Sequence, residues 1–265
     1  MSASFESRRA FAEDLARRAG DLGLSYFRKL DTLTIESKGH QDMVSEADRE
    51  VELFVRRELA THFPDDGVVG EEHAPTKGSS DFTWVIDPID GTANFVSGVP
   101  AWTVVIACVE KGVPVVGVIH EPSLGETFAA HRGGGAALNG RPLRTSKATR
   151  LDEGSLGTGL SNRREMKNIV GLIDELFDEG GIFFRNASGA LMLAYVASGR
   201  LLGYVEEHMN AWDCLAGMLL IEEAGGTIVR PDPQTVLERG TVVITSCPGV
   251  FERVRALCGR AFQVT

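Results

Sequence analysis

The stretch WVIDPIDGTANF, from Trp84 to Phe95, decides how the rest of the chain is interpreted. Its apolar start, Trp84–Ile86, predicts a short buried strand, and the Asp-Pro pair that follows predicts the end of that strand, because proline cannot donate to a sheet ladder. Asp87 and Asp90 stand three residues apart on the expected turn, and a helix can begin at Gly91. Crowded carboxylates suit a hard cation such as Mg²⁺, and the free N–H groups of a helix start suit an anion. We therefore expect a metal ion and a phosphate group to meet on this turn.

An ordinary turn offers a second interpretation of the same two acids. Asp87 and Asp90 then serve as a turn aspartate and a helix N-cap, which are common roles for Asp beside Pro and Gly. On these two residues alone, this alternative stays open. An EF-hand loop fits poorly, because its D-x-D-x-D-G spacing and its distant Glu are absent.

Length and composition describe an ordinary globular protein. The 265 residues suffice for one large domain or two closely packed lobes, and 43% are hydrophobic and 24% charged. No apolar run approaches the ~20 residues that span a bilayer, and the N-terminus lacks the apolar core of a signal peptide, so we expect a cytoplasmic protein. The net charge of −10 argues against nucleic acid or an anionic membrane as the main partner. An anionic substrate would need a bound cation to reverse the local field.

The cysteines and the glycine run do not indicate a site of their own. The four cysteines are widely spread, without CxxC or Cys/His ligand spacing, which predicts buried free thiols: Cys108, Cys214, Cys247 and Cys258. Gly133–Gly135 lies between two strand-like runs and lacks the GxGxxG spacing of a nucleotide loop. It predicts a hairpin turn.

The periodicity of apolar residues predicts an α+β half followed by a layered α/β half. Helices are expected at 8–27 and after the capping-box sequence Ser45–Asp48, and later at 162–178, 190–198, 211–224 and 249–257. Strands are expected at 33–35, 103–110, 113–120, 127–131, 136–138, 182–184, 201–205, 227–229 and 242–245. We see no internal repeat or long linker, so we expect one domain over residues 1–265, with lobes of about 1–145 and 146–265.

Two acids elsewhere could complete a metal site. Glu71 follows the short apolar run Val68–Gly70, sixteen residues before Asp87, so both carboxylates could project from neighbouring strand ends. Asp213 occupies the third position of a helix that Asn210 can cap, at the edge of an apolar run. A solvated loop acid and a helix-dipole acid are the alternatives for these two positions.

With these residues, the chain resembles the inositol monophosphatase family of Mg²⁺-dependent, lithium-sensitive phosphatases. Four motifs occur in the expected order, from about Lys38 to Gly226: DMVSEAD at 42–48, GEE at 70–72, WVIDPIDGTANF at 84–95, and WDCLAG at 212–217 continued by EAGG at 223–226. The resemblance implies the layered α-β-α-β-α sandwich of the inositol monophosphatase and fructose-1,6-bisphosphatase type. It also implies a homodimer.

The family pattern implies a metal-binding role for five residues. Glu71, Asp87 and the backbone carbonyl of Ile89 would hold a first Mg²⁺. Asp87, Asp90 and Asp213 would hold a second, with Asp87 bridging. A third and weaker metal near Glu71 fits the same pattern. Two cations about 3.5–4 Å apart can stabilise both the attacking and the leaving oxygen of a phosphate ester, and four carboxylates with two Mg²⁺ are roughly neutral in total.

The same resemblance implies which residues handle water and phosphate. The backbone N–H groups of Gly91 and Thr92 would receive the phosphate. Thr92 and Asp48 match the pair that polarises the attacking water, with Glu71 as a further member of the catalytic group. Lys38 is a possible additional site residue, although the loop around it varies within the family.

The organic half of the substrate is expected to face a third set of residues. Glu206, with Asp90 assisting, matches the acid that contacts substrate hydroxyls, and Ser188 and Gly189 match the helix start that lines the pocket. Relatives often have Gly-Ser-Ala-Ala there, where this chain has Ala187-Ser-Gly-Ala190. The exchange could reshape the pocket or be neutral drift, since one methyl group shifts discrimination only ~10–200-fold.

We therefore expect a Mg²⁺-dependent phosphomonoesterase that hydrolyses a small polyol phosphate, most simply inositol 1-phosphate. Histidinol-phosphate and fructose-1,6-bisphosphate phosphatase activities are the near alternatives, because the phosphate-handling residues contact what all these substrates share. A catalytically silent binding or regulatory subunit and a structural Ca²⁺-binding domain are alternatives from other classes. Unaltered carboxylates at every expected ligand position favour the enzyme.

Overall fold

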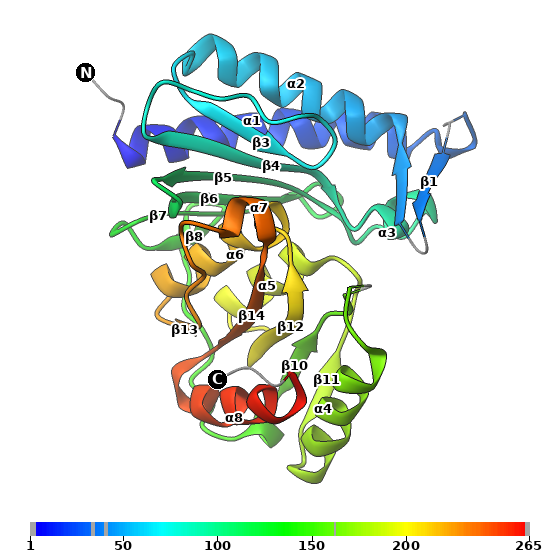
Figure 1. Cartoon of the computed structure of the whole chain (residues 1–265), viewed down its shortest axis with the longest axis vertical. Coiled ribbons are helices and arrows are strands. Elements are labelled where there is room, and N and C mark those ends of the chain that lie inside the picture. The colour runs from blue at the N-terminus through cyan, green and yellow to red at the C-terminus, as the bar shows by residue number, and fades with distance from the viewer. Residues whose placement is uncertain (1–3, 33–34, 40–41, 162, 263–265) are drawn as a thin grey trace.

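The computed structural model describes residues 4–32, 35–39, 42–161 and 163–262, and their side chains outside 32–44. It has two main sheets and the five alternating layers of helices and strands that the family resemblance predicts (Figure 1). The first layer is a pair of helices, α1 (Phe5–Phe27) and α2 (Glu46–His62), which pack on the outer face of the larger sheet. The N-cap Ser45 and Asp48 form the predicted capping box of α2.

The second layer is a seven-stranded sheet that follows chain order. Its strands are β3 (Gly67–Gly70), β4 (Phe82–Asp90), β5 (Thr103–Glu110), β6 (Val113–Glu121), β7 (Glu126–His131), β8 (Ala136–Leu138) and β9 (Arg141–Pro142). Only the β3–β4 pair is parallel, and the others form the antiparallel meander that the period-two pattern predicts. Gly133–Gly135 makes the predicted turn between β7 and β8. A separate hairpin pairs β1 (Ile35–Gly39) with β2 (Asp42–Ser45).

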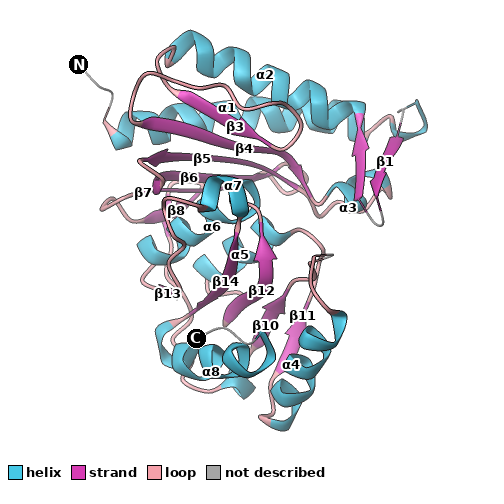
Figure 2. Ribbon diagram, in the orientation of Figure 1, coloured by secondary structure: helices cyan, strands magenta, loops and turns pink. Residues whose placement is uncertain are grey.

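The third layer lies between the two sheets (Figure 2). It consists of α5 (Gly189–Ala197) and α6 (Ala211–Glu223), which contact β5 and β6 on one side and β12 and β14 on the other. Both helices are apolar around most of their circumference, as buried helices are. The short α7 (Val236–Arg239) packs against α6, and the short α3 (Thr92–Val96) follows β4.

The fourth and fifth layers complete the molecule. The five-stranded sheet has the order β11-β10-β12-β14-β13, and its strands are β10 (Ser155–Thr158), β11 (Ile182–Phe184), β12 (Gly203–Met209), β13 (Thr227–Ile228) and β14 (Thr241–Ser246). On its outer face lie α4 (Met166–Asp178) and α8 (Phe251–Phe262). No helix among the described residues is both long and apolar enough to cross a bilayer.

Three expectations about elements need correction. Strand β4 does not end at the Asp-Pro pair but continues to Asp90, because a bulge between Asp87 and Asp90 places Pro88 where the ladder to β5 is interrupted. The sequence pattern does not predict strand β10, because Ser155–Thr158 contains only one large apolar residue. The strand forms through its pairing with β11 and β12. Helix α8 begins after a 3₁₀ turn and runs to Phe262, past the predicted end at residue 257.

Other expectations are confirmed or stay open. All four cysteines are buried free thiols, as predicted. Residues 33–34, part of a predicted strand, and residue 162, the predicted start of a helix, lie outside the described residues. The division into lobes of about 1–145 and 146–265 stays a prediction. The central apolar cluster takes residues from both parts, for example Val105 and Leu215.

Candidate active site

The parallel pairing of β3 and β4 brings Glu71 beside Asp87. In this register Gly70 pairs with Ile86, and Glu71 and Asp87 directly follow these two residues. Carboxyl ends of neighbouring parallel strands meet at one edge of a sheet, where α/β proteins gather ligands. The register therefore places the two carboxylates at neighbouring strand ends, as expected. Burial raises the pKa of Asp87, and the charge of Glu71 raises it further.

The bulge at the end of β4 turns the chain so that Asp87 and Asp90 face the same site. Asp87 accepts a hydrogen bond from the backbone N–H of Ile89 at 3.0 Å, which holds its carboxylate over the turn. Gly91 then adopts φ 93°, a left-handed conformation that favours glycine, and a Cβ there would lie 3.0 Å from the Ala101 carbonyl oxygen. The turn is therefore compact for reasons independent of any ligand.

Asp213 reaches the same site from α6. Its carboxylate accepts the backbone N–H of Asn210 at 3.0 Å, which completes the capping box at the helix start. One oxygen from each of Asp87, Asp90 and Asp213 lies within 4.8 Å of the others. The three carboxylates, which are far apart in the sequence or separated by a bulge, thus form a single cluster.

Asp90 has the most crowded hydrogen-bonding environment of the cluster. Its Oδ2 accepts bonds from the Ser188 hydroxyl, the Ala190 N–H at 3.0 Å and the Thr103 hydroxyl at 3.3 Å, while Oδ1 accepts the Gly189 N–H at 3.2 Å. Asp90 therefore caps the start of α5 across the site. Each carboxylate oxygen offers about two lone-pair positions, and Oδ1 accepts only one of these four bonds, so it keeps room for a further ligand.

The electrostatics of the cluster are unfavourable without a cation. Burial raises the pKa of Asp87 well above its usual value, and the charges of Glu71, Asp90 and Asp213 raise it further. Burial, followed by the charge of Asp90, raises the pKa of Asp213 to about 7. A buried set of oxygen ligands with mutual repulsion fits a hard divalent cation, so these residues fit the metal that the resemblance implies.

Thr92 and Asp48 meet next to this cluster. The Thr92 hydroxyl lies 3.0 Å from the Ile89 carbonyl oxygen and 3.3 Å from Asp48 Oδ1. Asp48 is fully buried, and burial raises the pKa of its carboxyl above the usual value. Helix α2 therefore presents a buried carboxylate to the hydroxyl on the turn.

A cleft of about 600 Å³ opens over these groups. The predicted site residues that line it are Glu71, Gly91, Thr92, Glu206 and Asp213. A smaller hollow of about 190 Å³ adjoins it and is lined by Asp90, Gly189 and Met209, among others. The Ser188 side chain is buried and directed to Asp90. The Lys38 side chain lies outside the part of the chain whose side chains are described.

Sequence reasoning missed several residues of the cleft and of the smaller hollow beside it. The Tyr204 hydroxyl donates to Glu206 at 2.5 Å, and burial raises the pKa of Glu206 to about 8. The two residues are two apart on β12, so period-two alternation could have placed them on one face. Arg163, Arg185 and His208 also line the cleft, but they come from a loop, a strand end and a strand, and no spacing in the sequence connects them.

Comparison with known proteins agrees with this geometry. The model of the inositol monophosphatase family matches residues 5–258. The chain belongs to the inositol monophosphatase family. It is 38% identical to an inositol-1-monophosphatase from Mesorhizobium japonicum over 232 residues, which cover 86% of this chain and 87% of the relative. It is also 41% identical to Nus factor SuhB from Xylella fastidiosa over 215 residues, which cover 80% and 78% of the two chains.

Solved structures show the same family fold. The extragenic suppressor protein suhB from Bartonella henselae superposes with a TM-score of 0.87 at 32% identity, covering 94% of this chain and 97% of the other. An inositol monophosphatase from Thermotoga maritima superposes with a TM-score of 0.84 at 30% identity, covering 97% and 98%. The predicted fold class of this inositol monophosphatase family member is thereby confirmed.

Proposed function

We propose that this family member is a Mg²⁺-dependent phosphomonoesterase that hydrolyses a small polyol phosphate, most simply inositol 1-phosphate. The observation that carries the proposal is the cluster of Asp87, Asp90 and Asp213, whose oxygens lie within 4.8 Å of one another beside the Thr92–Asp48 contact. A structural turn needs no such concentration of buried negative charge. A cation site does.

In this proposal two sets of ligands hold two metal ions. Glu71, Asp87 and the Ile89 carbonyl hold the first, and Asp87, Asp90 and Asp213 hold the second. A third ion near Glu71 is part of the proposal. Bound Mg²⁺ supplies positive charge that stabilises phosphoryl oxygens and acidifies water. The protein holds Asp87 and Asp90 in place through the Ile89 N–H and the start of α5.

Thr92 and Asp48 handle the proton of the attacking water. The Thr92 oxygen accepts a hydrogen bond from the water when its own hydroxyl donates to Asp48, so that the proton can pass through Thr92 Oγ1 to the Asp48 carboxylate. The 3.3 Å contact supports this path, and the raised pKa of Asp48 favours proton acceptance. The backbone N–H groups of Gly91 and Thr92 receive the phosphate.

The alcohol half of the substrate occupies the smaller hollow. Glu206, with its carboxyl held by Tyr204, and Asp90 contact the hydroxyl groups, and Gly189 forms part of the wall. Ser188 acts through its hydrogen bond to Asp90, because its side chain is buried behind that carboxylate. The homodimer expected from the resemblance belongs to this proposal as well.

Histidinol phosphate and fructose 1,6-bisphosphate are the competing substrates, and phosphate-release assays distinguish them. We expect Mg²⁺-dependent release from inositol 1-phosphate, inhibited by Li⁺, at a kcat/KM at least ten times that for histidinol phosphate, fructose 1,6-bisphosphate and glycerol 2-phosphate. Equal rates for all four would contradict a specific polyol substrate. No release from any of them with Mg²⁺ present would contradict the phosphatase assignment.

A second candidate function is that of a protein factor. Relatives from Xylella fastidiosa and Escherichia coli carry the name Nus factor SuhB, and they are 41% and 38% identical to this chain. In such a protein the fold could serve as a binding partner beside or in place of catalysis. The complete carboxylate cluster favours catalysis, because a silent member would tolerate amides at these positions. Phosphate release in these assays would exclude a factor that acts in place of catalysis.

A further inference from the structure

Helix α2 carries a second buried carboxylate, Glu52, which the proposed mechanism does not use. Its side chain is fully buried. Glu52 Oε2 accepts the backbone N–H of Glu72 at 2.7 Å, and Oε1 accepts the backbone N–H of His73 at 3.3 Å. Arg56, one turn along α2, donates to Oε1 at 2.6 Å. A buried carboxylate that binds two consecutive backbone N–H groups fixes the path of the loop that carries them.

We propose that Glu52, paired with Arg56, is a positioning residue that holds Glu71 in its metal-binding orientation. Glu71 directly precedes the two residues whose N–H groups Glu52 accepts. Arg56 strengthens the same attachment, because its guanidinium also donates to the His73 carbonyl oxygen at 3.1 Å. The loop after β3 is thus bound to α2 immediately beside the expected ligand.

Gly70 supports this interpretation from the other side of Glu71. A Cβ on Gly70 would lie 2.3 Å from Glu52 Oε1, so the Glu52 carboxyl occupies the space that any side chain at position 70 needs. The residues on both sides of Glu71, Gly70 at the end of β3 and Glu72 in the following loop, therefore contact the Glu52 carboxylate. The backbone of Gly70 is not in the left-handed region, so close approach, not backbone conformation, explains the glycine.

The position of Glu52 on α2 connects two parts of the active site. Asp48 and Glu52 are four residues apart, so they lie on one face of the helix, and both are fully buried. Asp48 contacts Thr92 on the phosphate turn, while Glu52 binds the loop that carries Glu71. One rigid helix therefore sets the distance between the proposed proton acceptor and the first metal site. Polar groups that orient metal ligands in this way typically contribute 10–100-fold to metal affinity.

The test is Glu52→Gln, measured first by the binding of Mg²⁺ alone. Whichever way the amide is oriented, its NH₂ group faces a donor, either the Glu72 N–H or Arg56 and the His73 N–H. We expect the Mg²⁺ concentration that gives half of the thermal stabilisation, and half of the maximal phosphate release, to rise at least ten-fold. At saturating Mg²⁺ we expect kcat and the KM for inositol 1-phosphate to stay within about three-fold of the wild type, because Glu52 touches neither substrate nor metal.

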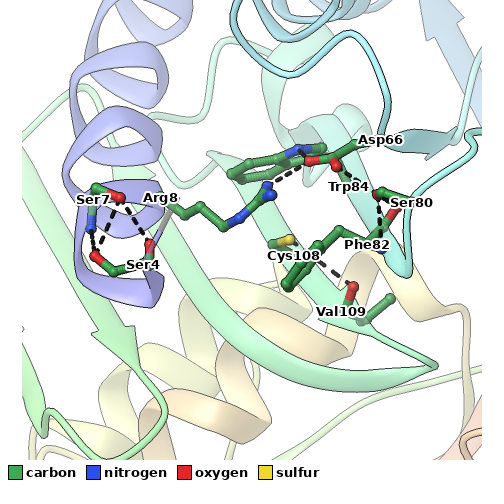
Figure 3. A network of polar contacts seen from close by, with 9 residues as sticks. All are labelled: Ser4, Ser7, Arg8, Asp66, Ser80, Phe82, Trp84, Cys108 and Val109. Carbon is green, nitrogen blue, oxygen red and sulfur yellow. Dashed lines mark hydrogen bonds and ion pairs between the residues drawn. The ribbon is translucent and has the colours of Figure 1, made fainter. Parts of the chain in front are cut away.

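A matched control is available at the other end of the sheet. Asp66 is also a buried acid paired with an arginine, Arg8, and it accepts the Trp84 indole N–H at 2.9 Å (Figure 3). Asp66→Asn should lower the melting temperature without changing the Mg²⁺ concentration dependence. The control thus distinguishes a general loss of stability, which lowers only the melting temperature, from a displacement of Glu71, which also changes the Mg²⁺ dependence.

Gly70→Ala provides a second variant, should Glu52→Gln fold poorly. It should displace the Glu52 carboxyl and weaken Mg²⁺ binding as well, whereas Gly171→Ala, at a position with open space around it, should not. The inference is overturned if Glu52→Gln folds and its Mg²⁺ dependence is unchanged. If only Gly70→Ala folds, an unchanged Mg²⁺ dependence of that variant overturns it. The inference rests on the proposed metal site. A wild type that does not respond to Mg²⁺ would therefore overturn both. A wild type and a variant that respond at the same Mg²⁺ concentration would overturn only the role of Glu52.

Discussion

Ala187 shows how a single residue stores strain beside the site. Its φ is 63°, in the left-handed region that costs an L-residue roughly 1 kcal/mol and that glycine enters freely. The second departure is Gly189, where relatives often have alanine. A Cβ at this position would lie 2.6 Å from Met209 Cε, so the Met209 side chain occupies the space that an alanine needs. The two departures from the common Gly-Ser-Ala-Ala sequence therefore act differently, one through backbone strain and the other through the space that Met209 fills.

Ala187→Gly should stabilise the protein. Relief of the strain exceeds the extra entropy of glycine in the unfolded chain, so we expect a gain of up to about 1 kcal/mol, or roughly 2–4 °C in melting temperature. The matched control is Ala194→Gly within α5, which should lower the melting temperature, because it weakens a regular helix and removes a buried methyl group. A lower melting temperature for Ala187→Gly would contradict the role of strain.

Asp90→Asn should damage both function and stability. An amide cannot accept the four hydrogen bonds that Asp90 receives from Thr103 and the start of α5, so we expect a loss of about 1–3 kcal/mol in the free energy of unfolding. Mg²⁺-dependent phosphate release should also fall below a hundredth of the wild-type rate. Denaturant unfolding and rate measurements on the same preparation check the two effects. A variant that is inactive yet fully stable would show that the hydrogen bonds to α5 are unimportant.

At the scale of elements, α1 packs closely against a buried histidine of the large sheet. His120 on β6 lies against Gly20 of α1, where a Cβ would be 2.5 Å from its ring, and its Nδ1 lies 3.0 Å from the Thr127 hydroxyl. Burial lowers the pKa of His120 to about 4, and the positive charge of Arg17 lowers it further, while the Glu126 backbone and Asp21 oppose the shift. The imidazole is therefore neutral in the folded protein near neutral pH.

This histidine should make the fold sensitive to acid. Between pH 6.5 and 4 the unfolded chain binds a proton that the folded protein does not, so stability is complete above pH 6.5 and falls as the pH decreases. From pH 7 to pH 5 we expect a loss of about 2 kcal/mol through this residue. Urea unfolding of the wild type and His120→Gln at both pH values measures it. An equal acid loss in the two proteins would exclude His120 as the cause.

The elements also show how far sequence patterns reach. Helix α2, its capping box, the meander β5–β8 and the turn at Gly133–Gly135 follow from local periodicity and turn residues, and all are found. The extension of β4 through Pro88 does not follow, because the bulge depends on the partner strand β5. Strand β10 likewise depends on neighbours that are distant in the sequence.

The same distinction applies to the site. The motifs identified Asp87, Asp90 and Asp213, and the structure brings them together. The contact of Ser188 with Asp90 was not predictable, because a hydroxyl has the same sequence signature whether it faces a substrate or a buried carboxylate. The contact of Tyr204 with Glu206 was within reach of the alternation along β12. Glu52 escaped notice for a similar reason, since a glutamate in a helix usually faces solvent.

At the scale of the whole molecule, the fold brings the proposed metal ligands to one cleft from the large sheet, from the loop after β3 and from a helix between the two sheets. Asp87 and Asp90 come from the large sheet, while Asp213 comes from α6 between the sheets. Metal binding should therefore stabilise the fold, because it relieves the repulsion among carboxylates that different layers contribute. Mg²⁺ at saturation should raise the melting temperature of the wild type by several degrees and leave that of Asp213→Asn nearly unchanged.

The most direct test compares Mg²⁺-dependent phosphate release from inositol 1-phosphate by the wild type and Asp213→Asn. The amide oxygen can still accept the Asn210 N–H, so the variant should fold, and Asp174→Asn on exposed α4 provides a control with the same change in charge. We predict a wild-type rate that requires Mg²⁺, a control rate that matches it, and at least a hundred-fold loss in Asp213→Asn, equivalent to about 2.7 kcal/mol of transition-state stabilisation. A folded Asp213→Asn variant with the wild-type rate and Mg²⁺ dependence would contradict the assignment of the carboxylate cluster as the catalytic metal site.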